Sequence, residues 1–163
     1  MPVGETPMLT RAQVRAAIVA GVVAGIVSTL AQGVMWVTLT DSFPTILWRD
    51  TRFAAAIVLG DAALSGGRSA AAVWIAATLI HFVLSIVYAS LLGVAVRTRT
   101  LPVAFLIGGV FGVALYVVNM YGFTTVYPWF AEARDPITLG AHVVFGATAA
   151  IVFRCMGDPT RGD

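Results

Sequence analysis

The side chains of this sequence that could carry proton or ligand chemistry lie within long uncharged segments. Its only two histidines, His81 and His142, lie in such segments, and so do Gln32 and Asn119. An imidazole titrates near neutral pH, and polar groups in lipid normally face one another or a water-filled space. We therefore predict one intramembrane polar cluster, whose candidate members are Gln32, His81, Ser85, Tyr88, Tyr116, Asn119 and His142.

Three interpretations of this cluster stay open. In the first, the polar groups fasten neighbouring helices, and neutral histidines are paired with Gln32, Asn119, Ser85 or Tyr116. In the second, the histidines titrate within a proton or solute pathway. The third is a metal or bis-histidine haem site, for which two histidines without an intramembrane carboxylate or cysteine form a poor ligand set. We favour the first and expect neither a metal ion nor a cofactor.

The sequence lacks the patterns of an enzyme active site. It shows no arrangement of nucleophile, base and orienting group, no phosphate-binding loop, and no paired carboxylates within an apolar segment. Cys155 is the only cysteine, which excludes an intramolecular disulfide and a cysteine metal cluster. We therefore predict a non-catalytic accessory, structural or stress-related role. The alternatives are a small transporter or proton-linked channel, and a haem-binding redox subunit.

Four uncharged stretches of the chain are long enough to cross a bilayer, which takes about 20 apolar residues in a helix. The chain is 59% hydrophobic and 11% charged. A soluble protein of this size could not bury so many hydrophobic residues. We predict an all-α four-helix membrane bundle that forms one domain over 1–163, with the lipid bilayer as its main partner. The expected spans are about 16–39, 71–96, 102–124 and 137–153.

The apolar segment 53–64 is too short to span a membrane and is predicted to be an interfacial or re-entrant helix. The arginines set the expected orientation, because basic residues gather on the cytoplasmic side. Few acidic residues accompany Arg11, Arg15, Arg97, Arg99, Arg154 and Arg161, whereas Arg49, Arg52, Arg68 and Arg134 lie in the opposite loops. Both termini are then cytoplasmic. Because the arginines form no patch with interleaved aromatic residues, we expect no nucleic-acid partner.

Similar residues recur in the same order in the two halves of the chain. Gly21, Gly25 and Gln32 recur at one common offset as Gly108, Gly112 and Asn119. The second span of each half then carries a histidine, a small residue and an alanine at intervals of four: His81, Ser85 and Ala89, and later His142, Gly146 and Ala150. We interpret this as two repeated hairpins, with chance recurrence as the alternative. The candidate helix-packing residues are Gly21, Gly25, Gly108, Gly112 and Gly146, because small residues let helices approach closely.

Charged residues outside the spans form a second candidate group at the outer surface. Its members are Arg49, Asp50, Arg52, Asp61, Arg134 and Asp135. Four of these form two adjacent Arg-Asp pairs, and for these pairs and Asp61 we predict local salt bridges. The alternative is a charged rim that gates the polar cluster.

Several segments resemble small four-span bacterial membrane proteins of unknown function, some of which carry the label "sodium:proline symporter". The resemblance lies in 81–88, 119–123, 128–130 and His142, with Arg49-Asp-Thr-Arg52 and 54–60 also similar, and it covers most of 44–154. A looser similarity is to the YagU-like inner-membrane proteins. The resemblance implies a bacterial inner membrane and supplies no catalytic residues. Apart from it, we expect a homo-oligomer or a partner in a membrane complex. A symporter role does not fit, because sodium–solute symporters use many more spans and broken helices around midplane ion sites.

Overall fold

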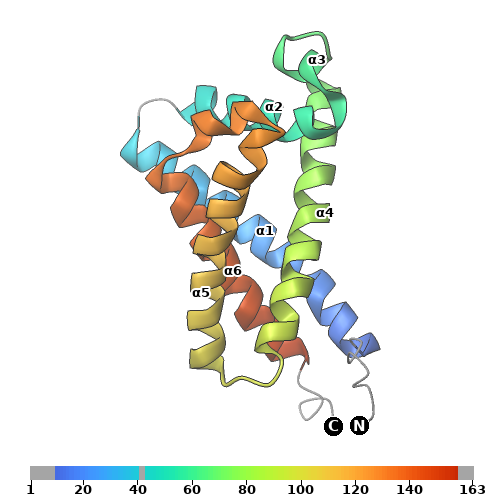
Figure 1. The fold of residues 1–163 in the computed structure, drawn as a ribbon, viewed down its shortest axis with the longest axis vertical. Coiled ribbons are helices and arrows are strands. Elements are labelled where there is room, and N and C mark those ends of the chain that lie inside the picture. The colour runs from blue at the N-terminus through green and yellow to red at the C-terminus, as the bar shows by residue number, and fades with distance from the viewer. Residues whose placement is uncertain (1–9, 41–42, 158–163) are drawn as a thin grey trace.

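The structure is a computed structural model that describes residues 10–40 and 43–157 (Figure 1). Four of its helices are long and apolar enough to cross a membrane: α1 (Arg11–Leu39), α4 (Ala70–Val96), α5 with its continuation (Leu101–Thr125), and α6 (Pro136–Gly157). No strand occurs in the described ranges. The predicted all-α bundle of four spans is therefore confirmed, and the chain is a multi-pass integral membrane protein.

Helix α6 lies at the centre of the bundle, against α1 on one side and α5 (Leu101–Val117) on the other, with α4 also in contact. The buried contacts are made mainly by small residues such as Ala20, Ala24 and Ala150, each 0% exposed. The large side chains that the bundle leaves exposed include Leu79 and Leu106. This distribution suits a membrane bundle, because small residues permit close helix packing while lipid solvates the large apolar ones.

Local sequence signals set where the spans begin. Thr10 caps α1, and its side chain and that of Gln13 form a reciprocal capping box. Ser69 caps α4 by accepting a hydrogen bond from the Ala72 amide, 3.3 Å away. The first turn of α5 contains proline, which has no amide proton. None is needed at this position, because the first amide groups of a helix have no partner within it.

The short helix expected over 53–64 differs in the structure. Helix α2 (Phe43–Leu59) begins well before that segment and lies across one end of the bundle (Figure 1), which we call the α2 end. Gly60 then adopts a positive φ of 64°, which glycine tolerates, and ends the helix. A separate single turn, α3 (Asp61–Leu64), leads toward α4. The first half of α2 contains Arg49, Asp50 and Arg52, so a search for apolar segments alone missed it.

The continuation of α5 is irregular. A π-helical turn, η1 (Val118–Gly122), is followed by two 3-10 segments, η2 (Phe123–Thr125) and η3 (Pro128–Ala133). The Arg134 side chain donates from Nε to the Met120 carbonyl oxygen at 2.7 Å and thereby satisfies a backbone group of the π turn. Irregular backbone at membrane depth is tolerated only where it is buried in protein or lines a cavity.

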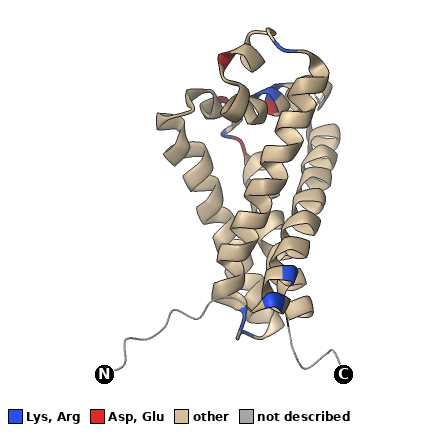
Figure 2. Ribbon diagram, turned by 90° about the vertical axis from the view of Figure 1, so that its right-hand side faces the viewer, with Lys and Arg blue, Asp and Glu red and all other residues tan. Residues whose placement is uncertain are grey.

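The charged residues separate to the two ends of the bundle (Figure 2). At the end opposite α2, Arg154 donates to the carbonyl oxygens of Arg99 (2.7 Å) and Arg97 (2.8 Å) and so ties α6 to the α4–α5 loop. Arg11 and Arg15 begin α1 at this same end. The described acidic residues Asp50, Asp61, Glu132 and Asp135 all lie in the segments at the α2 end.

Candidate functional site

A cavity of about 380 Å³, which we call the central cavity, lies among α1, α2, α4, α6 and the α5–η1 segment. Six of the seven predicted cluster residues line it: Gln32, His81, Ser85, Tyr88, Asn119 and His142. Tyr116 lies outside the lining. Its buried ring meets the His142 ring edge-on, with centroids 5.7 Å apart, and so supports the imidazole from behind.

A directional chain of hydrogen bonds runs along one wall of the central cavity. The Tyr88 hydroxyl donates to Asn119 Oδ1 at 3.0 Å. Asn119 Nδ2 lies 3.3 Å from His142 Nε2, and His142 Nδ1 lies 2.7 Å from the Thr138 carbonyl oxygen. A carbonyl oxygen can only accept, so Nδ1 carries the His142 proton and Nε2 accepts from Asn119. All donors and acceptors of this chain match when the imidazole is neutral.

His81 is held differently from His142. Its Nε2 lies 3.3 Å from the Gly25 carbonyl oxygen and 3.4 Å from Thr29 Oγ1, so Nε2 carries the proton and Nδ1 is the acceptor. Among the described residues, His81 Nδ1 has no hydrogen-bond partner. The N–H group of each imidazole therefore donates its hydrogen bond to a backbone carbonyl oxygen. A carbonyl oxygen has no proton of its own to donate to a next group, so neither chain continues as a proton relay. This arrangement favours binding over proton relay.

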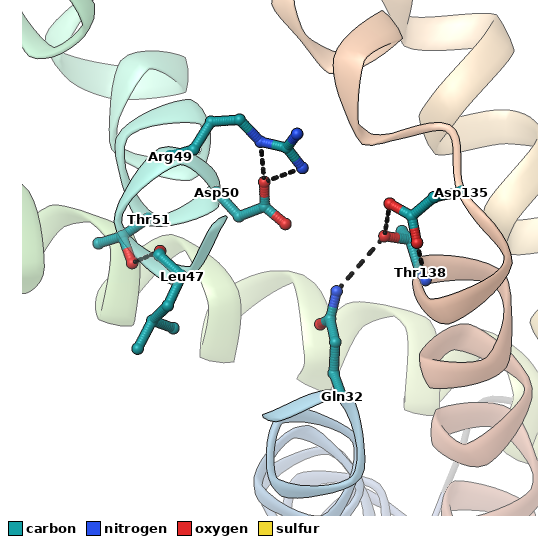
Figure 3. A network of polar contacts seen from close by, with 7 residues as sticks. All are labelled: Gln32, Leu47, Arg49, Asp50, Thr51, Asp135 and Thr138. Atoms are coloured by element: carbon teal, nitrogen blue, oxygen red, sulfur yellow. Dashed lines mark hydrogen bonds and ion pairs between the residues drawn. The ribbon is translucent and has the colours of Figure 1, made fainter. Parts of the chain in front are cut away.

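Thr138 joins the cavity wall to the α2 end (Figure 3). Its hydroxyl donates to Asp135 Oδ2 at 2.9 Å and accepts from Gln32 Nε2 at 3.4 Å, while its amide donates to Asp135 Oδ1 at 2.8 Å. Asp135 thus caps the start of α6. Gln32 is thereby held by α6, although it belongs to α1.

The two predicted Arg-Asp salt bridges have different outcomes. Arg49 and Asp50 form an ion pair, with Nη2 and Oδ1 2.8 Å apart. Asp135 instead caps α6, and in the described part of the chain it makes no ion pair with Arg134. The Arg134 guanidinium binds the Met120 carbonyl and Thr124 and lies 4.4 Å from the centre of the Tyr121 ring. The expectation failed for this pair because the helix start and the π turn offer closer partners.

The remaining charged candidates do not converge on the central cavity. Arg52 donates from Nε to the Ala63 carbonyl oxygen at 2.9 Å and so holds α3 against α2, while Asp61 is exposed in the first turn of α3. Burial raises the pKa of the Asp50 carboxyl above its ordinary value, partly offset by Arg49, and nearby Asp135 raises it further. Asp50 lies outside the spans and is not among the cavity-lining residues.

Four of the five candidate packing glycines lie at close backbone contacts, and the fifth, Gly25, lies against side chains. A Cβ atom on Gly21 would come within 2.6 Å of the Ile86 Cα atom, and one on Gly25 within 3.0 Å of His81 Nε2 and Ser85 Oγ. On α5, Gly108 abuts the Gly146 carbonyl oxygen and Gly112 abuts that of His142. The glycine face of α1 therefore packs on α4, and that of α5 packs on α6.

The described residues that line the central cavity include no Asp, Glu, Lys or Arg. No group of three or more His, Cys, Asp or Glu side chains that could hold a metal ion occurs in the cavity lining or elsewhere among the described residues. Both nitrogens of His142 are engaged, so haem ligation would first have to break a hydrogen bond. What the arrangement offers is an apolar space with uncharged donors and acceptors on its walls.

Sequence reasoning missed two features of this site. Thr138 and Thr29 were not candidates, yet they contact Gln32 and His81 respectively. Asp135 followed three residues later by Thr138 is a helix-start pattern that could have identified the first of these. The π turn that carries Asn119 has no comparable sequence signal.

The comparisons give no relative from which a role could be transferred: no protein-family model matches the chain, and neither a curated protein nor a solved structure matches it. The function must be argued from the cavity.

Proposed function

We propose that this protein is a non-catalytic membrane protein whose central cavity binds a small, neutral, largely apolar ligand. One observation carries the proposal: uncharged polar side chains from four spans converge on a cavity whose described lining contains no charged residue. Binding pockets are typically apolar, with a few placed polar groups, and begin at about 300 Å³. A charged ligand would be buried in this cavity without a counter-charge, which is costly.

The directional chain supports binding rather than mere fastening of helices. Its members already satisfy one another, but the Asn119 amide and the Tyr88 oxygen each retain further hydrogen-bonding capacity. Ser85 is 4% exposed overall, and it lines the central cavity. These groups are available to a ligand with an uncharged polar head.

A small transporter is the second candidate, and the π turn at Asn119 favours it. Interrupted helices commonly form the binding sites of transporters, and π-helical turns are frequent at functional sites. Both candidates share the same site. Flux of a neutral solute across proteoliposomes distinguishes transport from binding alone.

The two halves of the bundle support an origin by duplication. Gly25 packs on His81 and Ser85, and Gly112, its counterpart, packs on His142 and Val143. Gly21 likewise meets the Ser85 carbonyl oxygen, as Gly108 meets that of Gly146. Equivalent residues thus make equivalent contacts in each hairpin. The central cavity then lies between two copies of one helix-pair unit.

We place the protein in a bacterial inner membrane with both termini in the cytoplasm. The resemblance noted from the sequence supports the compartment, and the end of the bundle whose described charged residues are all arginine supports the orientation. We expect a reporter that is active only in the periplasm to stay inactive at either terminus. Periplasmic activity at the C-terminus would contradict this orientation.

The proposed binding can be tested by thermal unfolding of the purified protein in detergent. We expect n-octanol to raise the Tm saturably, because ligands that bind only the folded state stabilise it, whereas octanoate and octylammonium should not. Ala54→Leu adds bulk to the cavity wall and should abolish the rise, whereas Ala71→Leu, at an exposed position of α4, should retain it. An equal response from wild type and Ala54→Leu would overturn the proposal.

A further inference from the structure

We infer that the ligand of the central cavity is a neutral amphiphile of the bilayer, an acyl-chain lipid with an uncharged hydroxyl-bearing head such as a diacylglycerol, which reaches the cavity sideways between α4 and α5. This inference rests on the proposed binding function and adds the class of ligand and its route.

The central cavity is covered at the α2 end. Ala54 and Ile57 of α2 line it there, and so do Phe123, Tyr127 and Phe130 from the irregular segment after α5. The rings of Tyr127 and Phe130 meet edge-on, with centroids 6.4 Å apart. The wall at that end is therefore largely apolar and aromatic, and Gln32, held by Thr138, adds a polar group to it.

The side between α4 and α5 is less closely packed, although the Tyr88–Asn119 hydrogen bond crosses it. These two helices contact each other sparsely, whereas α6 packs closely on both α1 and α5. Figure 1 shows α4 standing apart from α5 above the loop that joins them. Ile80 and Leu84 of α4 and Leu115 of α5 line the cavity from the two sides of this gap. Since both helices span the membrane, what lies beyond the gap is lipid.

The wall chemistry selects an uncharged head with a hydroxyl group. A hydroxyl can donate and accept at once, which matches the cavity-lining Ser85 hydroxyl, the remaining Asn119 donor and the Tyr88 oxygen. A phosphate head would enter a space whose described lining holds no cation. The acyl chains can stay in the gap against Ile80 and Leu84, so only the head and the first carbons need fit the cavity.

The test uses the full chain in proteoliposomes with a diacylglycerol that carries a diazirine in one acyl chain, and phosphatidic acid with the same chains as the matched probe. After illumination, mass spectrometry maps the labelled residues. We expect the diacylglycerol to label residues 80–88 and 115–123 at least about tenfold more than phosphatidic acid does, because placing a charge in this setting is costly. Equal labelling by the two lipids would overturn the inference.

Two variants probe the route and the head. Leu84→Trp narrows the gap and should lower labelling by about tenfold or more, whereas Leu79→Trp, 62% exposed on the same helix, should leave it unchanged. Ser85→Ala preserves packing and should lower labelling by about threefold to tenfold, because one hydrogen bond is lost. Labelling that neither Leu84→Trp nor Ser85→Ala reduces would contradict the inference.

The octanol experiment separates failure of this inference from failure of the proposed function. If octanol stabilises the wild type but not Ala54→Leu, and the diacylglycerol does not label the cavity, the proposed binding function is supported and the lipid inference is wrong. If octanol gives no cavity-dependent stabilisation and the diacylglycerol does not label the cavity, the proposed function and the lipid inference are both wrong.

Discussion

Gly112→Ala is expected to destabilise the bundle strongly, whereas Gly109→Ala on the same helix is not. A Cβ atom at Gly112 would collide with the His142 carbonyl oxygen and lie 2.7 Å from the Val143 Cα atom. These are backbone atoms, so the whole of α6 must move to relieve the collision. We expect a loss of about 2 kcal/mol or more, and Gly112→Leu should prevent the bundle from forming.

Gly109 provides the matched control, because a Cβ atom there would have nothing within 4 Å. Alanine is a better helix former than glycine by about 1 kcal/mol, so Gly109→Ala should be neutral or stabilising. Gly25 should be intermediate, since its nearest atoms belong to the side chains of His81 and Ser85. Thermal unfolding in one detergent measures the series. If Gly112→Ala and Gly109→Ala unfold at the same temperature, the close packing of α5 on α6 is wrong.

Asn119→Leu is expected to have the largest effect of any change to the polar wall. It removes the acceptor of the Tyr88 hydroxyl and the donor to His142 Nε2 in one step. A buried polar group left without a partner costs about 1–3 kcal/mol; both groups here are partly buried, so the two together should cost toward the lower end of about 2–6 kcal/mol. We also expect the octanol-dependent rise in Tm to be lost.

A double-mutant cycle separates this effect from lost packing. Adding Tyr88→Phe to Asn119→Leu removes one of the two unpaired groups, and should recover about 1 kcal/mol or more. Tyr127→Phe is the control, because Tyr127 takes no part in the chain of hydrogen bonds from Tyr88 through Asn119 to His142. Additive losses from Tyr88→Phe and Asn119→Leu would show that the two side chains are not coupled.

The spans were predictable from the sequence because lipid imposes a simple requirement. A long uncharged segment can satisfy its backbone only as a helix, so length and composition identify α1, α4, α5 and α6. Helix α2 was only half recognised, because it lies across the bundle end and mixes Arg49, Asp50 and Arg52 with apolar residues. The π turn was missed altogether, since it depends on tertiary contacts such as that of Arg134 with Met120.

The candidate site was predictable in its members and less so in its contacts. Polar groups in lipid must seek partners, which explains why His81, Asn119 and His142 line one space. Which atoms pair is decided by rotamers and helix registers that the sequence does not specify. Gln32 therefore pairs with Thr138 and not with a histidine, and Asp135 serves as a helix cap instead of an ion-pair partner.

Nitrogen NMR of the histidine rings tests the proposed neutral ligand site most directly, because the chain has only two histidines. His142→Gln assigns the two sets of signals. We expect two neutral imidazoles of opposite tautomer at neutral pH, with the proton of His142 on Nδ1 and that of His81 on Nε2. We also expect n-octanol to shift the ring signals of His81 saturably and octanoate to leave them unchanged. A charged imidazole, two identical tautomers, or His81 signals indifferent to octanol would contradict a neutral ligand site in the central cavity.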